Sequence, residues 1–394
     1  MKALLNDGLE KDGVQLLEEF SIETDIHKRD PKNLLADVGQ FDALIVRSVT
    51  KVTRDVIEAG AKGKLKIIGR AGVGYDNIDV DAASECGVVV KSAPYGNTNA
   101  VAELTVGLML AISRKVPQAH HLLRAGVWEK EKLKGTELSF KTLGVLGCGK
   151  IGQRVAELVR RGFDMQVIGY DVKPCVESSI KFTSKEELLE KADYVTIHTG
   201  GKEVIVGDRE LKLMKPTAFL INTSRGANVD EAALYRALKE KRLAGAALDV
   251  YVDEPKAEGS EFKSRLRDLD NVVFSSHLGA STIEAQRETS IEIARVIVGY
   301  LRGGDFANSV NAGESIELEE RPVYNLFIHH RDVPGVFANI DKVLADNDIN
   351  IRANYSRQIG KGGYAISVYA VHKKVSADII KTLSGIENIC HVKI

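Results

Sequence analysis

The sequence predicts an α/β protein with two doubly wound, parallel-sheet domains and a ferredoxin-like C-terminal domain. Three observations predict this fold class. Short apolar runs alternate with amphipathic stretches up to about Ser276, as expected for parallel strands covered by helices. A glycine-rich turn joins one of these strands to a helix, in the context of a dinucleotide-binding unit. From Arg321 onward the order changes to strand, helix, strand, strand, helix, strand, which is the βαββαβ arrangement.

The first domain is expected at residues 1–97. Its strands are predicted at residues 43–47, 65–69 and 87–91, which are continuous apolar runs bounded by turn residues. An amphipathic stretch at residues 53–61 lies between the first two and predicts a helix. Strands that are apolar on both faces indicate a buried parallel sheet. The sequence ends this series at Pro94, because proline cannot donate to a strand ladder.

The second domain is expected at residues 98–283, between two long amphipathic helices. These helices are predicted from about Asn99 to Lys115 and from about Ile283 to Tyr300. The chain after residue 284 is expected to return to the first domain and complete it through residue 312. Six strands are predicted between the helices, in the segments TLGVLG, QVIGYD, YVTIH, AFLINTS, GAALDV and NVVFSS.

The third domain is expected at residues 321–394, after a polar linker at residues 305–320. A helix is predicted to open at Pro334, and a turn is predicted at residues 360–363. The strands and the second helix are predicted in VYNLFIHH, INIRANYSRQ, YAISVYAV, VSADIIKTL and NICHVKI.

Composition excludes several classes of protein. Lys and Arg number 54, and Asp and Glu number 55, so the chain lacks the charge excess of a nucleic-acid binder. The hydrophobic content of 44% excludes disorder of the whole chain. No targeting segment or membrane-length apolar run is visible, so we expect a cytoplasmic protein. Neither a zinc site nor a disulfide framework is expected, because no C-x-x-C pair occurs among Cys86, Cys148, Cys175 and Cys390.

A dinucleotide fingerprint begins at the end of the segment TLGVLG. Gly147, Gly149 and Gly152 form G-x-G-x-x-G around Lys150 and Ile151, after a strand and at the start of a helix. Asp171 ends the next strand, 19 residues after Gly152. A carboxylate there accepts hydrogen bonds from ribose hydroxyls and repels a 2′-phosphate, so the cofactor is predicted to be NAD. Lys173 would partly offset that repulsion.

Four polar residues follow strand ends in the same domain: Arg225, Asp249, Glu254 and His277. Ligands of open parallel sheets bind beyond the carboxyl ends of the strands, so these side chains are expected to converge. Histidine can accept a hydroxyl proton, a carboxylate can stabilise its imidazolium, and a guanidinium can bind a carboxylate. Taken singly, each would be read as a surface charge or a cap. Their convergence favours oxidation of a hydroxyl group.

The motifs GCGKIG, INTSRGANVDEAAL, AALDVYVDEP and HLGAST resemble, in that order, the D-isomer-specific 2-hydroxyacid dehydrogenase family. The resemblance covers essentially the whole chain. It implies that Arg225, Glu254 and His277 are catalytic, with His277 as acid and base. The sequence departs from the family pattern at Gly200-Gly201, where a proline and an apolar residue are usual. The cofactor site implied by the resemblance adds Val73, Thr199, Thr223, Ser224, Asp249 at the nicotinamide end, Gly279 and Ala280.

The resemblance also assigns the first domain to substrate binding. HLGAST with the following EAQ, and GRAGVGYDNID at residues 69–79, are similar to the branch that oxidises a phosphorylated 2-hydroxy acid. The amides of Gly72, Val73 and Gly74 would grip the carboxylate. Alternatively, the arginines of this domain are ordinary strand-end residues. The remaining substrate contacts implied by the resemblance are Arg47, Ser48, Arg70 and Asn97.

The tail resembles an ACT domain in HHRDVPGVF and NDINI. The resemblance implies amino-acid binding, with His330, Asp332 and Asn350 at the positions that contact serine in serine-inhibited relatives. Asparagine is more usual at position 332. In the alternative, the tail only supports oligomerisation.

The predicted protein is therefore an NAD-dependent dehydrogenase of a small phosphorylated 2-hydroxy acid, assembled as a homodimer or homotetramer and possessing no metal site. Two alternatives stay open. One is a dehydrogenase or reductase of another small 2-hydroxy acid, such as glyoxylate, hydroxypyruvate or lactate. The other is a non-catalytic, NAD-sensing protein similar to the transcriptional corepressors of this fold, which lack such a tail.

Overall fold

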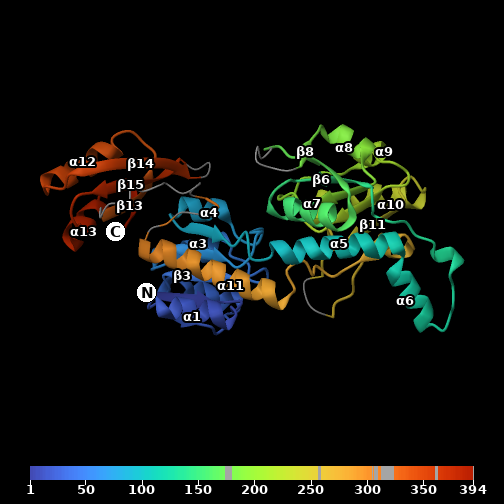
Figure 1. Cartoon of the computed structure of the whole chain (residues 1–394). Coiled ribbons are helices and arrows are strands. Elements are labelled where there is room, and N and C mark those ends of the chain that lie inside the picture. Colours follow the sequence, from blue (N-terminus) through green and yellow to red (C-terminus); the bar gives the residue numbers. More distant parts are fainter. Residues whose placement is uncertain are drawn as a thin grey trace. The chain divides into compact units, whose positions relative to one another are not determined.

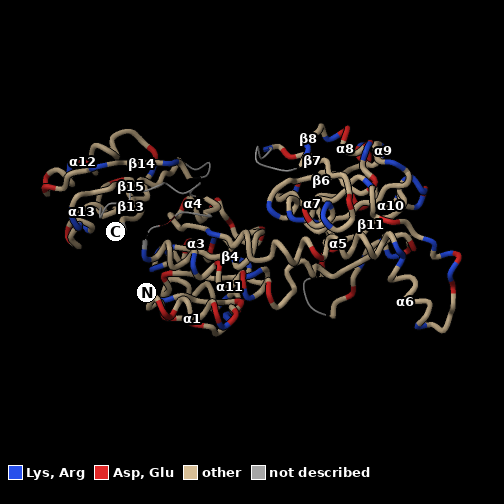
Figure 2. The backbone as a smooth tube through the Cα atoms, in the orientation of Figure 1, with Lys and Arg blue, Asp and Glu red and all other residues tan. Residues whose placement is uncertain are grey.

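The computed structural model describes residues 1–173, 180–255, 259–303, 305, 309–311, 324–359 and 363–393. The chain forms two compact units. Unit 1 comprises Met1–Gly96 and Gln286–Ile394, and unit 2 comprises Asn97–Ala285 (Figure 1). Basic and acidic residues are interspersed in both units (Figure 2), in keeping with the net charge of −1. No helix among the described residues is long and apolar enough to cross a membrane.

The first sheet of unit 1 has five parallel strands in the order β2-β1-β3-β4-β5. Its faces are covered by two separate cores: Ala3 and Leu5 of β1 point into one, and Leu4 points into the other. The order of the strands reverses between β1 and β3, which is where such sheets bind ligands. The strands are β1 (Lys2–Leu5), β2 (Glu23–Asp25), β3 (Ala43–Val46), β4 (Ile67–Arg70) and β5 (Val89–Ser92).

Helices from two distant parts of the chain cover this sheet. Helix α11 (Ile283–Val298) returns to pack on β4 at Gly69, where an added Cβ would lie 2.9 Å from the Ile297 Cδ1 atom. A short π-helical turn at Gly299–Gly303 follows α11, so the regular helix ends two residues before the predicted Tyr300. Helix α1 (Lys11–Glu19) shares the core of α11, and helices α2 (Pro31–Asp37), α3 (Arg54–Lys62) and α4 (Val80–Glu85) contribute to the core on the other face.

Unit 2 contains a seven-stranded parallel sheet in the order β12-β11-β10-β9-β6-β7-β8. The order reverses between β6 and β9, so the chain is doubly wound, as predicted. The short edge strand β8 was not predicted from the sequence. The strands are β6 (Thr142–Leu146), β7 (Gln166–Tyr170), β8 (Lys181–Phe182), β9 (Tyr194–Ile197), β10 (Phe219–Asn222), β11 (Gly245–Leu248) and β12 (Val272–Phe274).

Helices cover both faces of the second sheet. Helices α5 (Thr98–Arg114) and α7 (Lys150–Phe163) contribute to one core. Helices α8 (Lys185–Lys191), α9 (Asp208–Leu213) and α10 (Glu231–Lys239) contribute to the other. Helix α6 (Val116–Arg124) differs, because it contains no buried residue.

The tail has the predicted βαββαβ order and an antiparallel sheet, β14-β15-β13-β16. Helix α12 begins at Val336 and not at Pro334 as predicted, because Gly335 adopts a φ of +89° and forms the N-cap. The predicted linker and the turn at residues 360–363 lie largely outside the described residues. The elements are β13 (Tyr324–Arg331), α12 (Val336–Asp346), β14 (Ile351–Ile359), β15 (Tyr364–Val371), α13 (Ala377–Ser384) and β16 (Ile389–Lys393).

Candidate active site

The glycine turn after β6 is built for close backbone packing. Gly147 has a φ of +91°, and an added Cβ would lie 2.7 Å from the carbonyl group of His198. A Cβ on Gly152 would lie 2.2 Å from the Gly147 carbonyl oxygen. Gly149 instead faces open space, because a Cβ added there would meet no atom within 4 Å. The turn therefore leaves room for a phosphate group at the N-terminus of α7, which begins at Lys150 and continues through Ile151.

Asp171 lies beside this turn. One carboxylate oxygen accepts a hydrogen bond from the Cys148 amide at 2.7 Å, and the other accepts one from the Lys173 amide at 2.9 Å. These two bonds fix the carboxylate at the end of β7. Each carboxylate oxygen retains a further lone pair with which it can accept a ribose hydroxyl.

A buried asparagine organises the loop that follows β9. The Asn228 side-chain amide donates to the carbonyl oxygens of Gly201 at 3.3 Å and Glu203 at 2.9 Å. Its oxygen accepts from Thr199 Oγ1 at 3.4 Å and Ser224 Oγ at 3.0 Å. The Gly200-Gly201 segment is thus tied down despite its glycines. Sequence reasoning missed Asn228, although it lies within the segment INTSRGAN.

Other polar side chains near the cofactor turn bond within the protein. Thr223 Oγ1 lies 2.9 Å from Thr105 Oγ1, and Ser224 Oγ donates to Asn222 Oδ1 at 2.8 Å. His198 is partly buried, with its Nε2 atom 2.9 Å from Thr196 Oγ1, and desolvation of the ring lowers the pKa of His198 to about 3. His198 is therefore neutral at physiological pH.

Arg225 and Glu254 come from different loops that meet through their backbones. Arg225 is half-buried, and its Nη1 atom donates to the Ser224 carbonyl oxygen at 2.8 Å. A Cβ added to the next residue, Gly226, would lie 1.9 Å from the carbonyl carbon of Tyr251. Only glycine permits this approach, which brings the arginine loop against the loop that carries Glu254.

His277 and Glu254 form a hydrogen-bonded pair. The His277 Nδ1 atom lies 2.9 Å from Glu254 Oε2, and Glu254 Oε1 accepts from the Tyr251 amide at 3.2 Å. The side chains are 53% and 36% exposed, respectively. Because Nδ1 is engaged by the carboxylate, Nε2 is the ring nitrogen available for proton exchange with a ligand.

The pairing shifts the pKa values of His277 and Glu254 in the directions that favour the charged form of each side chain. The hydrogen bond to Glu254 raises the pKa of His277, and burial opposes this rise. Burial would raise the pKa of Glu254, but the hydrogen bond with His277 and the positive charges of His277 and Arg225 help to lower it overall. The arrangement suits a histidine that gains a proton beside a permanent carboxylate.

Asp249 supports the turn on which His277 stands. Its Oδ1 atom accepts from Ser275 Oγ at 2.6 Å and from the Leu278 amide at 2.8 Å, and its Oδ2 atom accepts from the Gly279 amide at 3.0 Å. Its carbonyl oxygen accepts from the His277 amide at 2.8 Å. His277 itself has a φ of +56°. The fully buried Asp249 carboxylate therefore holds this left-handed turn, a task that the resemblance, which placed it at the nicotinamide, did not indicate.

In unit 1, Asp7 fixes the loop that carries Arg47 and Ser48, at the strand-order reversal of the first sheet. Asp7 Oδ2 accepts from the Arg47 amide at 2.8 Å and from the Thr50 amide at 3.1 Å. The Arg47 Nη2 atom lies 3.7 Å from Glu10 Oε1. Ser48 is exposed at the surface.

Arg70 and Gly72 depend on each other. Gly72 has a φ of +141°, and an added Cβ would lie only 1.4 Å from Arg70 Nη1, so the guanidinium folds over this glycine. The same Nη1 atom donates to the Ala71 carbonyl oxygen at 3.1 Å. Val73 and Gly74 follow and are partly exposed. Asn97 belongs to unit 2, where it precedes α5.

The predicted effector residues of the tail are engaged within the domain. His330 is fully buried, with Nδ1 2.8 Å from the Arg331 carbonyl oxygen and Nε2 2.7 Å from Ser367 Oγ. Asp332 Oδ2 accepts from Gln358 Nε2 at 2.5 Å. The backbone amide of Asn350 donates to His372 Nδ1 at 2.9 Å.

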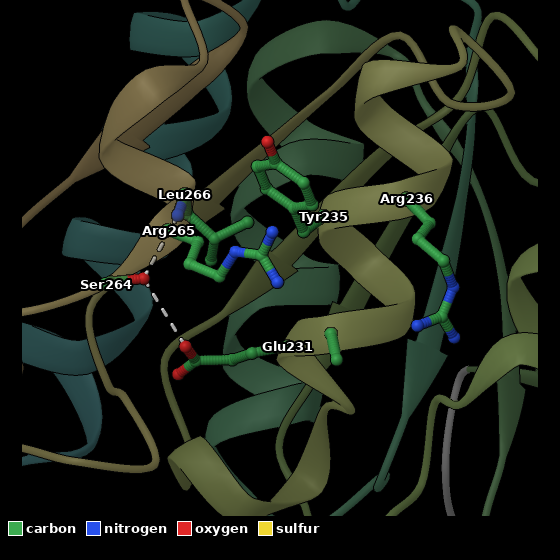
Figure 3. A pocket seen from close by; sticks show the side chains of 7 residues that line it. Glu231, Tyr235, Arg236, Ser264, Arg265 and Leu266 are labelled. Atoms are coloured by element: carbon green, nitrogen blue, oxygen red, sulfur yellow. Dashed lines mark hydrogen bonds between the residues drawn. The ribbon is translucent and has the colours of Figure 1, made fainter.

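A separate pocket of about 430 Å³ lies on unit 2 between α10 and the segment Ser264–Leu266 (Figure 3). None of the residues predicted to bind cofactor or substrate lines it. One of its lining residues, Glu231, also binds the backbone of the loop that carries Glu254. The pocket therefore borders the loop that carries Glu254.

Comparisons with known proteins find two family models that match the chain. Residues 106–279 match the family model "D-isomer specific 2-hydroxyacid dehydrogenase, NAD binding domain", and residues 324–388 match the ACT domain model. The chain is 44% identical over 322 residues to D-3-phosphoglycerate dehydrogenase of Methanocaldococcus jannaschii, covering 79% of this chain and 59% of that protein. It thus spans about three fifths of that relative's length.

Two further relatives are matched over nearly their whole length. Hydroxypyruvate reductase of Thermotoga maritima is 41% identical, with 74% of this chain and 96% of the relative covered. The crystal structure of a glyoxylate reductase from Paecilomyes thermophila superposes with a TM-score of 0.69 at 30% identity, covering 79% and 98% of the two chains. The chain therefore belongs to the D-isomer-specific 2-hydroxyacid dehydrogenase family, with that family's NAD-binding domain and a C-terminal ACT domain.

Proposed function

We propose that this protein is an NAD-dependent D-3-phosphoglycerate dehydrogenase, which forms 3-phosphohydroxypyruvate in the first step of serine biosynthesis. The observation that carries the proposal is the His277–Glu254 pair, 2.9 Å apart, on loops held together by Gly226 and Asp249. Several relatives that bear this enzyme's name are about 40% identical to the chain.

In the proposed reaction His277 accepts the proton of the substrate hydroxyl at Nε2. Glu254 holds Nδ1, fixes the tautomer and stabilises the imidazolium. Arg225 binds the substrate carboxylate through its guanidinium and polarises the carbonyl group that forms. When bound, NAD accepts the hydride from the carbon that carries the hydroxyl group.

The residues at the switch point of unit 2 fit NAD. The open space at Gly149 and the N-terminus of α7 suit the pyrophosphate, and Asp171 suits the adenosine ribose. Thr199, Thr223 and Ser224 bond within the protein, so their contribution is to shape the site. The remaining cofactor contacts are proposed at Val73, Gly279 and Ala280.

The substrate contacts are proposed on unit 1. The amides of Gly72 to Gly74 would bind the carboxylate, and Arg47, Ser48 and Arg70 would make further contacts with the substrate. One observation favours a second candidate, a reductase or dehydrogenase of a smaller hydroxy acid. Arg47 already lies 3.7 Å from Glu10, so part of its charge is balanced within the protein.

A substrate panel decides between these functions. NADH formation is measured with 3-phosphoglycerate, D-lactate, glycerate and 2-hydroxyglutarate, with the His277→Asn variant as the control for background reduction. We expect kcat/KM to be highest for 3-phosphoglycerate. A higher value for an unphosphorylated acid would establish the second candidate, and no turnover of any acid would favour the non-catalytic alternative.

The proposal also covers the binding of an effector by the tail and the oligomeric state of the protein. We infer that the tail binds L-serine or another amino acid, supported by the αL residue Gly335 in front of α12, which leaves the backbone there open. We also infer a homodimer or homotetramer, supported by the apolar side chains of α6 and the following segment. Val116, Leu123 and Trp128 are 55%, 56% and 85% exposed, more apolar surface than a monomer ordinarily leaves open.

A further inference from the structure

The loop that carries Glu254 lies outside any helix or strand, so other contacts must hold it. At its start, the Tyr251 hydroxyl group lies 2.8 Å from the Leu248 carbonyl oxygen and 2.7 Å from that of Ser275. Gly226 packs against the Tyr251 carbonyl group. These contacts tie the beginning of the loop to the ends of β11 and β12.

The next residue of the loop is held differently. The Val252 side chain is 56% exposed, so apolar packing contributes little to its position. Its backbone amide donates to Glu231 Oε1 at 2.9 Å. The other oxygen of the same carboxylate lies 3.5 Å from Ser264 Oγ, as drawn in Figure 3. Glu231 is the first residue of α10 and therefore stands on a rigid element.

We propose that Glu231 is a positioning residue for the catalytic pair, because its carboxylate clamps the Val252 amide and so keeps Glu254 against His277. The inference rests on the proposed role of His277 as proton acceptor. The link is short: Glu231 binds the amide of Val252, the turn at residues 252–253 leads directly to Glu254, and Glu254 binds His277 Nδ1.

A purely structural role for Glu231 makes different predictions. An acidic residue in the first turn of a helix stabilises that helix through its negative charge. Glu231 would then matter for the charge alone and not for the hydrogen bond to Val252. Positioning of the loop requires instead an oxygen acceptor at the end of a side chain of this length.

Two substitutions separate these roles. Glu231→Gln keeps the length and an oxygen acceptor but removes the charge. Glu231→Asp keeps the charge but withdraws the carboxylate by one methylene group. Under the proposal Gln preserves the position of Glu254 and Asp does not. Under the helix-charge role neither substitution moves Glu254, and only Gln destabilises α10. Glu240→Ala, which removes an exposed carboxylate after the end of α10, is the matched control.

The readout is the pKa of the His277 ring in the full-length chain without substrate. It is followed by NMR of histidine-labelled protein, with His277→Asn identifying the signal among the 9 histidines. We expect the pKa of His277 to fall by up to about half a unit in Glu231→Asp and Glu231→Ala, toward the ordinary value of about 6.5. Glu231→Gln and Glu240→Ala should leave it unchanged.

Activity supplies the second readout. The acidic limb of the pH profile of kcat/KM should move to lower pH in Glu231→Asp. In Glu231→Gln the acidic limb should stay at its wild-type position. Equal pKa values of His277 in wild type and Glu231→Asp would overturn the inference, as would a fall in Glu231→Gln. Absence of turnover in the wild type would refute the proposed function instead, and the NMR titration would still decide the positioning role.

Discussion

Replacing Glu254 by Gln should shift the pH profile of the reaction, while substrate and cofactor still bind. The His277–Glu254 hydrogen bond raises the pKa of His277, and glutamine removes the negative charge at the same length. In the proposed reaction the neutral imidazole is the base of the oxidation, so kcat/KM is expected to rise with pH through this pKa. Lowering the pKa therefore moves the acidic limb to lower pH.

The size of the shift follows from exposure. The Glu254 and His277 side chains are 36% and 53% exposed, so solvent screens their attraction and it resembles a surface pair of up to about 1 kcal/mol. One pKa unit corresponds to about 1.4 kcal/mol. The acidic limb should therefore move down by up to about 0.7 of a pH unit. The maximal kcat should also fall, because the imidazolium loses its stabilising charge.

The contribution of the His277–Glu254 pair to folding stability depends on pH. The raised pKa of His277 adds stability that is full below about pH 6.5 and is lost as pH rises through the folded value. The lowered pKa of Glu254 adds stability above about pH 4.5 that is lost as pH falls. Urea unfolding should show a larger loss for Glu254→Gln near pH 5.5 than near pH 8.5.

The assay is NADH formation between pH 5.5 and 9.5 for wild type and Glu254→Gln, with His277 followed by NMR in the same buffers. An acidic limb that stays in place, or that moves to higher pH, would refute the assignment of Glu254 as the partner of the base.

Three further predictions rest on other contacts. Asp171→Ser should lower the NAD-over-NADP ratio of kcat/KM by tenfold or more, since a lost charged hydrogen bond costs about 1.5–3 kcal/mol; a wild type that already prefers NADP would mean that Lys173 controls the choice. Gly226→Ala should destabilise unit 2 by about 1–3 kcal/mol in urea unfolding and lower kcat, because its Cβ would lie 1.9 Å from Tyr251; unchanged stability would contradict the close approach. Millimolar L-serine should inhibit the full-length enzyme and not a chain ending at residue 320, and Asp332→Ala should alter the response. Equal inhibition of both chains would place the effector site outside the tail.

The sequence predicted the fold class because its parallel strands are buried on both faces and read as continuous apolar runs. The glycine fingerprint could be assigned because its residues are neighbours in the chain. Short edge strands such as β8 carry too few residues for a pattern. The start of α12 was misplaced because a glycine cap, and not proline, begins the helix.

The supporting residues of the site could not be assigned from the sequence. Asp249 and Asn228 act through hydrogen bonds to backbone groups 25 to 30 positions away, and such partners are set by the packing of loops at the sheet edge. Glu231 lies within the motif INTSRGANVDEAAL, but the motif does not indicate its hydrogen bond to the Val252 amide. That bond depends on the packing of α10 against the loop after β11.

The central claim is that His277 takes the hydroxyl proton, and His277→Asn tests it most directly. Asparagine fills much of the same space but cannot act as a base. We predict a fall in kcat of about 10²–10⁴-fold, with NAD binding, measured by calorimetry, retained within a few fold. A variant that turns over at near the wild-type kcat would contradict the account.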